Sequence, residues 1–380
     1  MDRPSVSPKT PRILAVDFWR GVCLLMIFID HIPGNPLAAV TLRSWGYADA
    51  AEIFVFLAGV SAFLSFGRFF DSGDYADGFL RCAVRTWQLF RAHILLVFGI
   101  AAIVGGYGLF ADASPFIGEF NLDPLFHDPG LALPYIAVLR YMPSMSDILP
   151  IYILFVAGFP AMWFLMRRSP FLLLALSFAL WLTANISGYN FPNYPEGRRW
   201  FLNPLAWQLM FASGMAVAAY RQKLAPLARS NLLLAACIAV ATVGVVAAAP
   251  WTHYKPWAAY RVFHFKYELM MVHKSNLFPP RVSHFFALLV IGLRVLPSHS
   301  PFWETRFARA LITTGRHALP VYCAGVLLSL VIYMLLQTRQ ANTAEILLVN
   351  MAGAALLIGL AALLEKIRSR GKAAALMRIA

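Results

Sequence analysis

The stretch "DFWRGVCLLMIFIDH", Asp17 to His31, decides how the rest of the chain is interpreted. Most of it is apolar and long enough for a membrane-spanning helix, yet it contains two Asp, one Arg and one His. An ionisable side chain at the centre of a membrane helix costs about 2.5–3.5 kcal/mol on insertion scales, so such residues face a bundle interior or a water-filled cavity. The stretch therefore predicts a membrane helix with a functional inward face.

The composition places the whole chain in the same class. Of its 380 residues, 60% are hydrophobic and 13% are charged, whereas soluble chains are about 45–50% apolar and about 25% charged. The net charge of +14 is spread over short connections, which indicates membrane topology and argues against a nucleic-acid partner. The four cysteines lie far apart without a CxxC pair, so we expect no disulfide framework and no metal site.

Apolar runs of membrane-spanning length recur along the sequence. They lie near residues 13–32, 50–67, 90–110, 146–166, 170–188, 201–219, 231–250, 284–297, 316–336 and 344–364. Ten spans place both termini on one side, and the excess of Lys and Arg in the connections on that side makes it cytoplasmic. We therefore predict an all-α, polytopic bundle of about ten transmembrane helices over residues 12–366, with cytoplasmic tails at 1–11 and 367–380 and membrane lipids as partners.

Helical geometry sorts the charges of the first span. Arg20 and His31 are eleven residues apart, which places them within about 20° of each other and about 16 Å apart along the axis. Asp17 lies on the same side, and Asp30 points elsewhere. One interpretation is a buried Asp17–Arg20 pair plus a histidine used for packing. The functional interpretation is an acid–base His31 at the outer end, with a cationic site half a membrane below it.

The second span begins "YADAAEIFVFLAGVSAF", residues 47–63. Glu52 is expected at a depth similar to His31, where a carboxylate would fix the tautomer of the imidazole. The alternative is an ordinary carboxylate at the membrane interface. Gly59 shares a helix face with Glu52 and predicts a close approach of another backbone or of a ligand.

Two outer segments are candidates for binding the acceptor. The connection 251–283 combines aromatic and basic residues, including Trp257, Arg261 and Lys266. These fit either an interfacial aromatic belt that meets lipid headgroups or a vestibule for sugar rings and an acidic group. In "NPLAWQLMF", Asn203 and Gln208 lie near an outer boundary, where an amide would hydrogen-bond to a sugar or carbonyl.

At these residues the sequence resembles a known family. "RGVCLLMIFIDH" and "EIFVFLAGV" are similar to the first two helices of acyltransferase-3 proteins, with their Arg, ten residues, His signature. More closely, "DFWRGVCLLMIFIDHIPGNPL", "FLNPLAWQLMFASG", "HFFALL" and "TGRHALPVYCAGVLLS" resemble OpgC proteins. Two positions depart from the pattern: Ala58 stands where the motif usually has Ser, and His317 stands where Ser is common.

The resemblance implies a multi-pass O-acyltransferase of the bacterial inner membrane, with no permanently bound cofactor. It would transfer succinyl groups from succinyl-CoA, an acyl-CoA donor substrate, to osmoregulated periplasmic glucans. The roles of the helix 1 Arg and His carry over to Arg20 and His31. We expect His31 to act as general base, or as a transient acyl carrier, oriented by Glu52 or Asp30.

The donor and acyl group need cations of their own. Arg20, supported by Asp17, is expected to meet the pantetheine or pyrophosphate of the donor. The remaining donor phosphates need cations at the cytoplasmic face, where Arg85 and Arg316 are our candidates in a larger arginine cluster completed by Arg81, Arg91 and Arg309.

The succinyl carboxylate would be met by Arg261, Lys266 or Arg43. The alternatives are an acetyltransferase for another envelope polysaccharide, a transporter or flippase of envelope glycans, and a scaffold for glucan synthesis.

Overall fold

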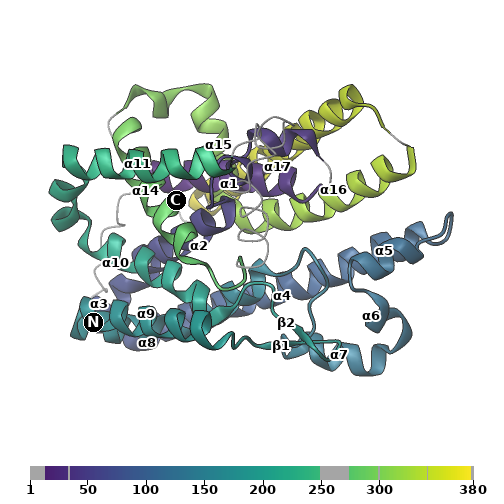
Figure 1. Ribbon diagram of the computed structural model, residues 1–380, viewed down its shortest axis with the longest axis horizontal. Coiled ribbons are helices and arrows are strands. Elements are labelled where there is room, and N and C mark those ends of the chain that lie inside the picture. Colours follow the sequence, from purple (N-terminus) through teal and green to yellow (C-terminus); the bar gives the residue numbers. More distant parts are fainter. Residues whose placement is uncertain (1–12, 33–34, 249–273, 298–299, 340, 378–380) are drawn as a thin grey trace.

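The structure is a computed structural model that describes residues 13–32, 35–248, 274–297, 300–339 and 341–377. These residues form a helical bundle with one small pair of strands (Figure 1). The first part comprises α1 (Leu14–Asp30), the 3-10 turns η1 (Pro36–Val40) and η2 (Leu42–Ser44), α2 (Ala50–Ala62), the π-helical turn η3 (Phe63–Gly67), α3 (Arg68–Asp71) and α4 (Tyr75–Tyr107). The middle part comprises α5 (Ser114–Glu119), α6 (Asp123–His127), α7 (Pro129–Ala137), α8 (Ile148–Arg168), α9 (Pro170–Ser187), α10 (Pro204–Ala228) and α11 (Asn231–Ala248). The last part comprises α14 (Pro279–Val295), η5 (Pro301–Glu304), α15 (Arg306–Arg316), α16 (Ala318–Arg339) and α17 (Thr343–Met377).

The predicted helical bundle is confirmed, and a helix lies at each apolar run. Within the described residues, six helices are long and apolar enough to cross a membrane, or up to seven if the pair α10 and α11, bent by 98°, counts as one span. Helices α1 and α14 have 17 residues each, somewhat less than the roughly 20 of a typical span. Ten spans and cytoplasmic termini therefore remain predictions.

Some helix boundaries differ from the hydropathy pattern. Helix α4 begins at Tyr75 rather than near residue 90, so Arg81, Arg85 and Arg91 lie on the helix and not in a connection. Arg, Gln and Leu are good helix formers, and hydropathy alone does not detect a polar extension of a membrane helix. The run at 316–336 is divided at His317, whose backbone leaves the helical region between α15 and α16. Helix α17 continues past residue 366 to Met377.

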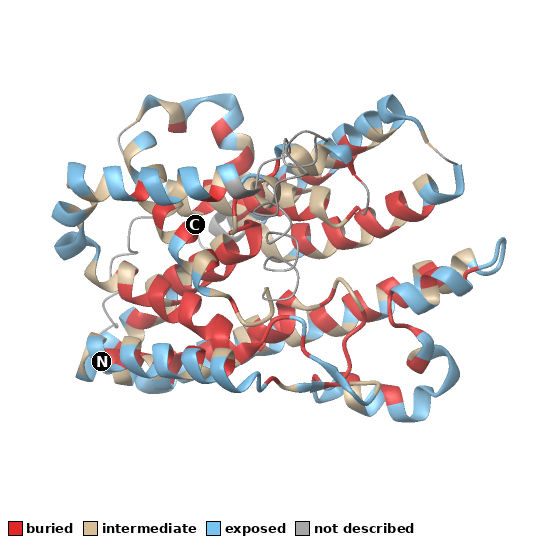
Figure 2. Cartoon of the chain, in the orientation of Figure 1, coloured by how far each residue is buried: buried red, intermediate tan, exposed pale blue. Residues whose placement is uncertain are grey.

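The core lies where α1, α2, α8, α10 and α16 meet, and buried residues line these helices (Figure 2). The close approach predicted at Gly59 is confirmed: a Cβ there would lie 2.0 Å from the carbonyl oxygen of Phe211 on α10. Gly214 on α10 makes the reciprocal close approach, since a Cβ there would lie 2.1 Å from the carbonyl oxygen of Phe56. Paired small residues let two helix backbones touch, so α10 packs directly against α2 and supports it.

A short segment after α1 folds back over its end. Asn35 caps η1 and exchanges amide hydrogen bonds with Asn350 of α17. Thr41 Oγ1 donates to Asp30 Oδ1 at 2.7 Å, and Trp45 Nε1 donates to the Ala39 carbonyl at 2.6 Å. These bonds fix η2, and with it Arg43, beside the end of α1.

The connection between α4 and α8 carries α5, α6 and α7. Strands β1 (Pro192–Asn193) and β2 (Arg198–Arg199) pair antiparallel in the connection between α9 and α10. The two connections are tied together, since Met142 N donates to Asn193 Oδ1 at 3.0 Å.

Candidate functional site

His31 lies at the C-terminal cap of α1 and is half-buried. Its Nδ1 is 2.6 Å from the carbonyl oxygen of Ile27, one turn earlier. A carbonyl only accepts hydrogen bonds, so Nδ1 carries the proton and Nε2 carries the lone pair. The helix backbone thus holds the imidazole in the tautomer that a general base requires.

His31 lines a cavity of about 290 Å³, which we call the His31 cavity. Its charged lining residues come from distant parts of the chain: Asp30, Arg43, Asp49, Asp147, Lys274 and Arg281. Met145, Phe201 and Tyr322 also line it. Acidic and basic side chains therefore share this cavity with the imidazole.

A buried ion network supports this cavity. Arg281, of which only 2% is exposed, donates from Nε to Glu52 Oε1 at 2.6 Å and from a terminal nitrogen to Asp49 Oδ2 at 3.1 Å. Lys274 Nζ lies 2.6 Å from the same Asp49 oxygen. Burial opposes ionisation of Asp49, but the charges of Lys274 and Arg281 outweigh it and hold the pKa of that carboxyl below its usual range.

This network changes the predicted role of Glu52. Its second oxygen accepts a hydrogen bond from the Asp49 N–H at 2.9 Å and closes a capping box at the start of α2. Both carboxylate oxygens of Glu52 are thus engaged, one by Arg281 and the other by the Asp49 backbone. Asp30 is likewise engaged by Thr41. In the described part of the chain, His31 Nδ1 donates its hydrogen bond to the Ile27 carbonyl. No hydrogen bond found among these residues joins the ring to Glu52 or Asp30, which have other partners, so the expected orienting contact is not present.

Asp147 is an acidic residue that our sequence reasoning missed. It precedes α8, lines the His31 cavity, and forms none of the ion pairs found among the described residues. Burial raises the pKa of Asp147 to about 7. Its position after a Pro-rich connection gave no periodic signal by which it could have been recognised.

A second cavity, of about 170 Å³, lies deeper along α1 and contains Arg20; we call it the Arg20 cavity. Arg85 of α4 and Arg316 of α15 line it together with Arg20, so three of the predicted donor-binding residues are brought together. The Nε atom of Arg20 is buried and has no hydrogen-bond partner. A cluster of arginines with unused donor capacity is typical of a site for an anion.

Asp17 is buried beside this cavity. Its carboxylate lies 3.6 Å from Arg316 Nε. Arg316 is also 3.8 Å from Glu365 of α17, and His317 Nε2 is 2.8 Å from the other oxygen of Glu365. Asp17, Arg20 and His31 therefore all face the inside of the bundle, as expected, but Asp30 lines the His31 cavity as well, so the expectation that it points elsewhere was wrong. Arg316 forms an ion pair with Asp17, and the spacing within α1 could not reveal this partner.

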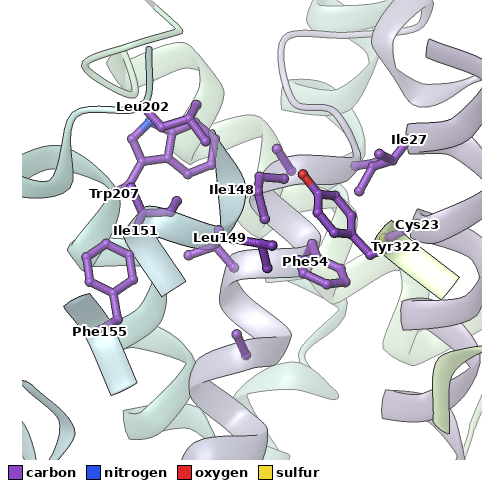
Figure 3. Packing of buried hydrophobic residues seen from close by; sticks show 14 of the residues in the cluster. Cys23, Ile27, Phe54, Ile148, Leu149, Ile151, Phe155, Leu202, Trp207 and Tyr322 are labelled. Carbon is purple, nitrogen blue, oxygen red and sulfur yellow. The ribbon is translucent and has the colours of Figure 1, made fainter. Parts of the chain in front are cut away.

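Tyr322 of α16 lines both cavities. Its ring stacks on Phe54 of α2, with centroids 6.3 Å apart and planes at 28°. Figure 3 shows the Tyr322 hydroxyl directed toward Ile148, which lines the His31 cavity, with Phe54 below the ring. Phe54 lines the Arg20 cavity. The two aromatic rings therefore form the wall between the two cavities.

A third and larger hollow, of about 680 Å³, is lined by residues of η3, α3 and α4; we call it the Arg68 groove. Arg68, Arg81 and Arg85 line it, and Arg81 pairs with Asp77 at 3.7 Å. Arg85 also lines the Arg20 cavity, so the two spaces adjoin through this side chain.

The remaining predicted acceptor residues lie elsewhere. Gln208 donates to the carbonyl of Ser177 at 2.7 Å, and Asn203 caps α10 while its amide donates to Asn276 at 2.9 Å. Both amides thus connect α10 to its neighbours, and neither lines the His31 cavity. The other three candidates, Trp257, Arg261 and Lys266, lie outside the described residues.

Apolar helices of membrane length around buried, charged cavities define a multi-pass membrane protein. Within the described residues, no group of three or more His, Cys, Asp or Glu side chains is placed to hold a metal ion. The chain belongs to the OpgC protein family, whose sequence profile matches residues 12–369. Membership of this family makes it, in general terms, a glucan-modifying acyltransferase. Neither the curated proteins nor the solved structures contain a significant match.

Proposed function

We propose that this protein is an inner-membrane O-acyltransferase that transfers a succinyl group from succinyl-CoA to hydroxyls of osmoregulated periplasmic glucans. The observation that carries the proposal is the pair of adjoining cavities: one contains a histidine with its Nε2 lone pair free, and the other contains converging arginines. Acyl transfer from a thioester needs a base at one place and a holder of donor phosphates at another.

The separation of the two sites fits an acyl-CoA. Arg20 and His31 are about 16 Å apart along α1 by helix rise. The pantetheine arm between pyrophosphate and sulfur has a backbone as long as about four extended peptide residues, or about 15 Å. Arg20, Arg85 and Arg316 would then hold the pyrophosphate, with the nucleotide in the Arg68 groove and the thioester at His31.

The chemistry at His31 follows from its tautomer. The sugar hydroxyl oxygen attacks the thioester carbonyl carbon while Nε2 takes the hydroxyl proton. When the C–S bond breaks, the protonated imidazole returns this proton to the departing thiolate, which leaves as free CoA. The products are a sugar ester and a thiol, and His31 is regenerated. The Ile27 carbonyl keeps the ring in place throughout.

The succinyl carboxylate would be met by Arg43. Lys274 and Arg281 are already paired with Asp49 and Glu52. Arg43 donates only to the backbone carbonyl of Asp30, at 3.3 Å, among the hydrogen bonds found in the described residues. Its other guanidinium donors are therefore available to a carboxylate in the cavity.

The proposal is tested with purified protein in nanodiscs, labelled succinyl-CoA and periplasmic glucan, by measuring labelled ester on the glucan. Wild type should form ester, and His31→Gln should lose at least about 100-fold in rate, the lower part of the range for general acid–base catalysis. The matched control is His127→Gln, because His127 of α6 has the same Nδ1 contact with a carbonyl four residues earlier but lies outside the cavities.

Two results would overturn the proposal. One is no ester from well-folded wild type with any acyl-CoA, which would favour glycan transport or a scaffold role. The other is an undiminished rate in His31→Gln. Incubation with donor alone separates the two chemical routes, since acylated His31 would show a covalent intermediate and its absence would favour direct transfer.

A further inference from the structure

The reaction at His31 needs a hydrogen-bond donor for the oxygen of the thioester carbonyl, which becomes negatively charged when the sugar hydroxyl attacks. The arginines of the Arg20 cavity are expected to be about half a membrane away, so they are too deep for this task. In the His31 cavity, Lys274 and Arg281 are held by carboxylates. A donor near the wall between the two cavities would be better placed. The pantetheine arm, held at its pyrophosphate end in the Arg20 cavity, would bring the thioester past this wall to His31.

Tyr322 has this position and an available hydroxyl. It is 3% exposed, it is on α16, and it lines both cavities. Its hydroxyl is 3.4 Å from the carbonyl oxygen of Met145, whereas normal O–H···O hydrogen bonds are about 2.5–3.0 Å long. This long contact is its only hydrogen bond in the described part of the chain, so a ligand oxygen at normal distance would be a better acceptor. The hydroxyl points toward Ile148, a residue of the His31 cavity (Figure 3).

The packing around the ring holds this geometry. Phe54 stacks against the ring from the Arg20 side, and α16 is anchored to α1 because Ser329 donates to the Phe28 carbonyl at 2.9 Å. A rigid ring pays little conformational entropy when its hydroxyl binds a ligand, and a preorganised donor is most effective in a site that excludes water.

We infer that Tyr322 is a further catalytic residue, whose hydroxyl donates a hydrogen bond to the thioester carbonyl oxygen during acyl transfer. This inference rests on the proposed function. As the sugar oxygen bonds to the carbonyl carbon, the carbonyl π electrons move to the oxygen, which accepts the Tyr322 O–H. The tyrosine keeps its proton throughout. When the C–S bond breaks, the carbonyl reforms and His31 delivers the transferred proton to the thiolate.

The test is Tyr322→Phe, which keeps the aromatic wall and removes only the hydroxyl. We expect kcat to fall about 100- to 1,000-fold, the loss typical of one oxyanion donor, with the KM for the donor changed less than threefold. The matched control is Tyr333→Phe on the same helix, whose hydroxyl donates to Glu119 at 2.9 Å away from both cavities. This control should retain wild-type kcat.

Two further measurements separate a chemical role from packing. Thermal unfolding of Tyr322→Phe should match that of wild type, and Tyr322→His, which restores an N–H donor, should recover part of kcat relative to the Phe variant. Wild-type kcat in Tyr322→Phe, or a loss confined to KM, would overturn the inference while leaving the proposed function intact. Absence of transfer in wild type would instead overturn the proposed function itself.

Discussion

The two cavities that meet at Tyr322 differ in how their charges are balanced. In the His31 cavity, Lys274 and Arg281 are paired with the carboxylates of Asp49 and Glu52. In the Arg20 cavity, Arg316 is paired with Asp17 and Glu365, whereas Arg20 and Arg85 form none of the ion pairs found among the described residues. The first arrangement builds a rigid, nearly neutral surrounding for an uncharged base, whereas the second leaves positive charge for an anionic ligand to neutralise.

The largest effect is expected when the paired charges of the His31 cavity are disrupted. Arg281→Met leaves Glu52 buried without its cation, and removing one partner of a buried ion pair costs about 3–5 kcal/mol. The midpoint of thermal unfolding in detergent should fall strongly. Arg294→Met on the same helix is the control, since Arg294 bonds only to Asn231 in the described structure. The double variant Arg281→Met/Glu52→Leu should recover part of the loss, and an unchanged midpoint in the single variant would show that the network does not hold the fold.

In the Arg20 cavity, substitution of an arginine should leave the fold intact but weaken the binding of the acyl-CoA donor. Arg20→Gln removes a buried donor that has no protein partner at Nε, so unfolding should change little. A lost charge-assisted hydrogen bond to phosphate is worth about 1.5–3 kcal/mol, which predicts an increase of about 10- to 100-fold in the KM for acyl-CoA. Arg229→Gln, an exposed arginine at the end of α10, serves as control. A strong fall in thermal stability with unchanged KM would reverse the assignment of the two cavities.

Arg43 differs from the other cations of the His31 cavity, because its described hydrogen bond is to a backbone carbonyl and not to a carboxylate. Arg43→Gln should reduce kcat/KM about tenfold with succinyl-CoA and change it less than threefold with butyryl-CoA, which has no carboxylate. Arg198→Gln, exposed on β2, should change neither value. Equal losses with both donors would mean that Arg43 supports the fold or the acceptor instead of the acyl carboxylate.

These contrasts also show what the sequence could reveal. The spacing of Arg20 and His31 predicted a shared inward face because the helix period is local and lipid excludes charge. The partners of Glu52 and Asp17 could not be predicted, since Arg281 and Arg316 are far away in the chain and are brought close only by the packing of α14 and α15. The cap and interhelix contacts of Asn203 and Gln208 could not be predicted either, since an amide near a helix start serves caps and contacts as often as ligands.

Substitution of Asp147 is expected to give the smallest effect. It tests the charge balance of the His31 cavity through the pH dependence of stability. Its raised folded-state pKa of about 7 means that between about pH 4 and pH 7 the folded state holds a proton that the unfolded state has lost. Stability should therefore fall as pH rises through this window and level off above pH 7. Asp147→Asn carries no such proton, so the unfolding midpoint of wild type should decline relative to the variant by a few degrees, since solvent around the partly exposed carboxyl weakens the effect. Parallel curves for the two proteins would mean that Asp147 is ionised throughout, and the His31 cavity would then carry one more fixed negative charge opposite Lys274.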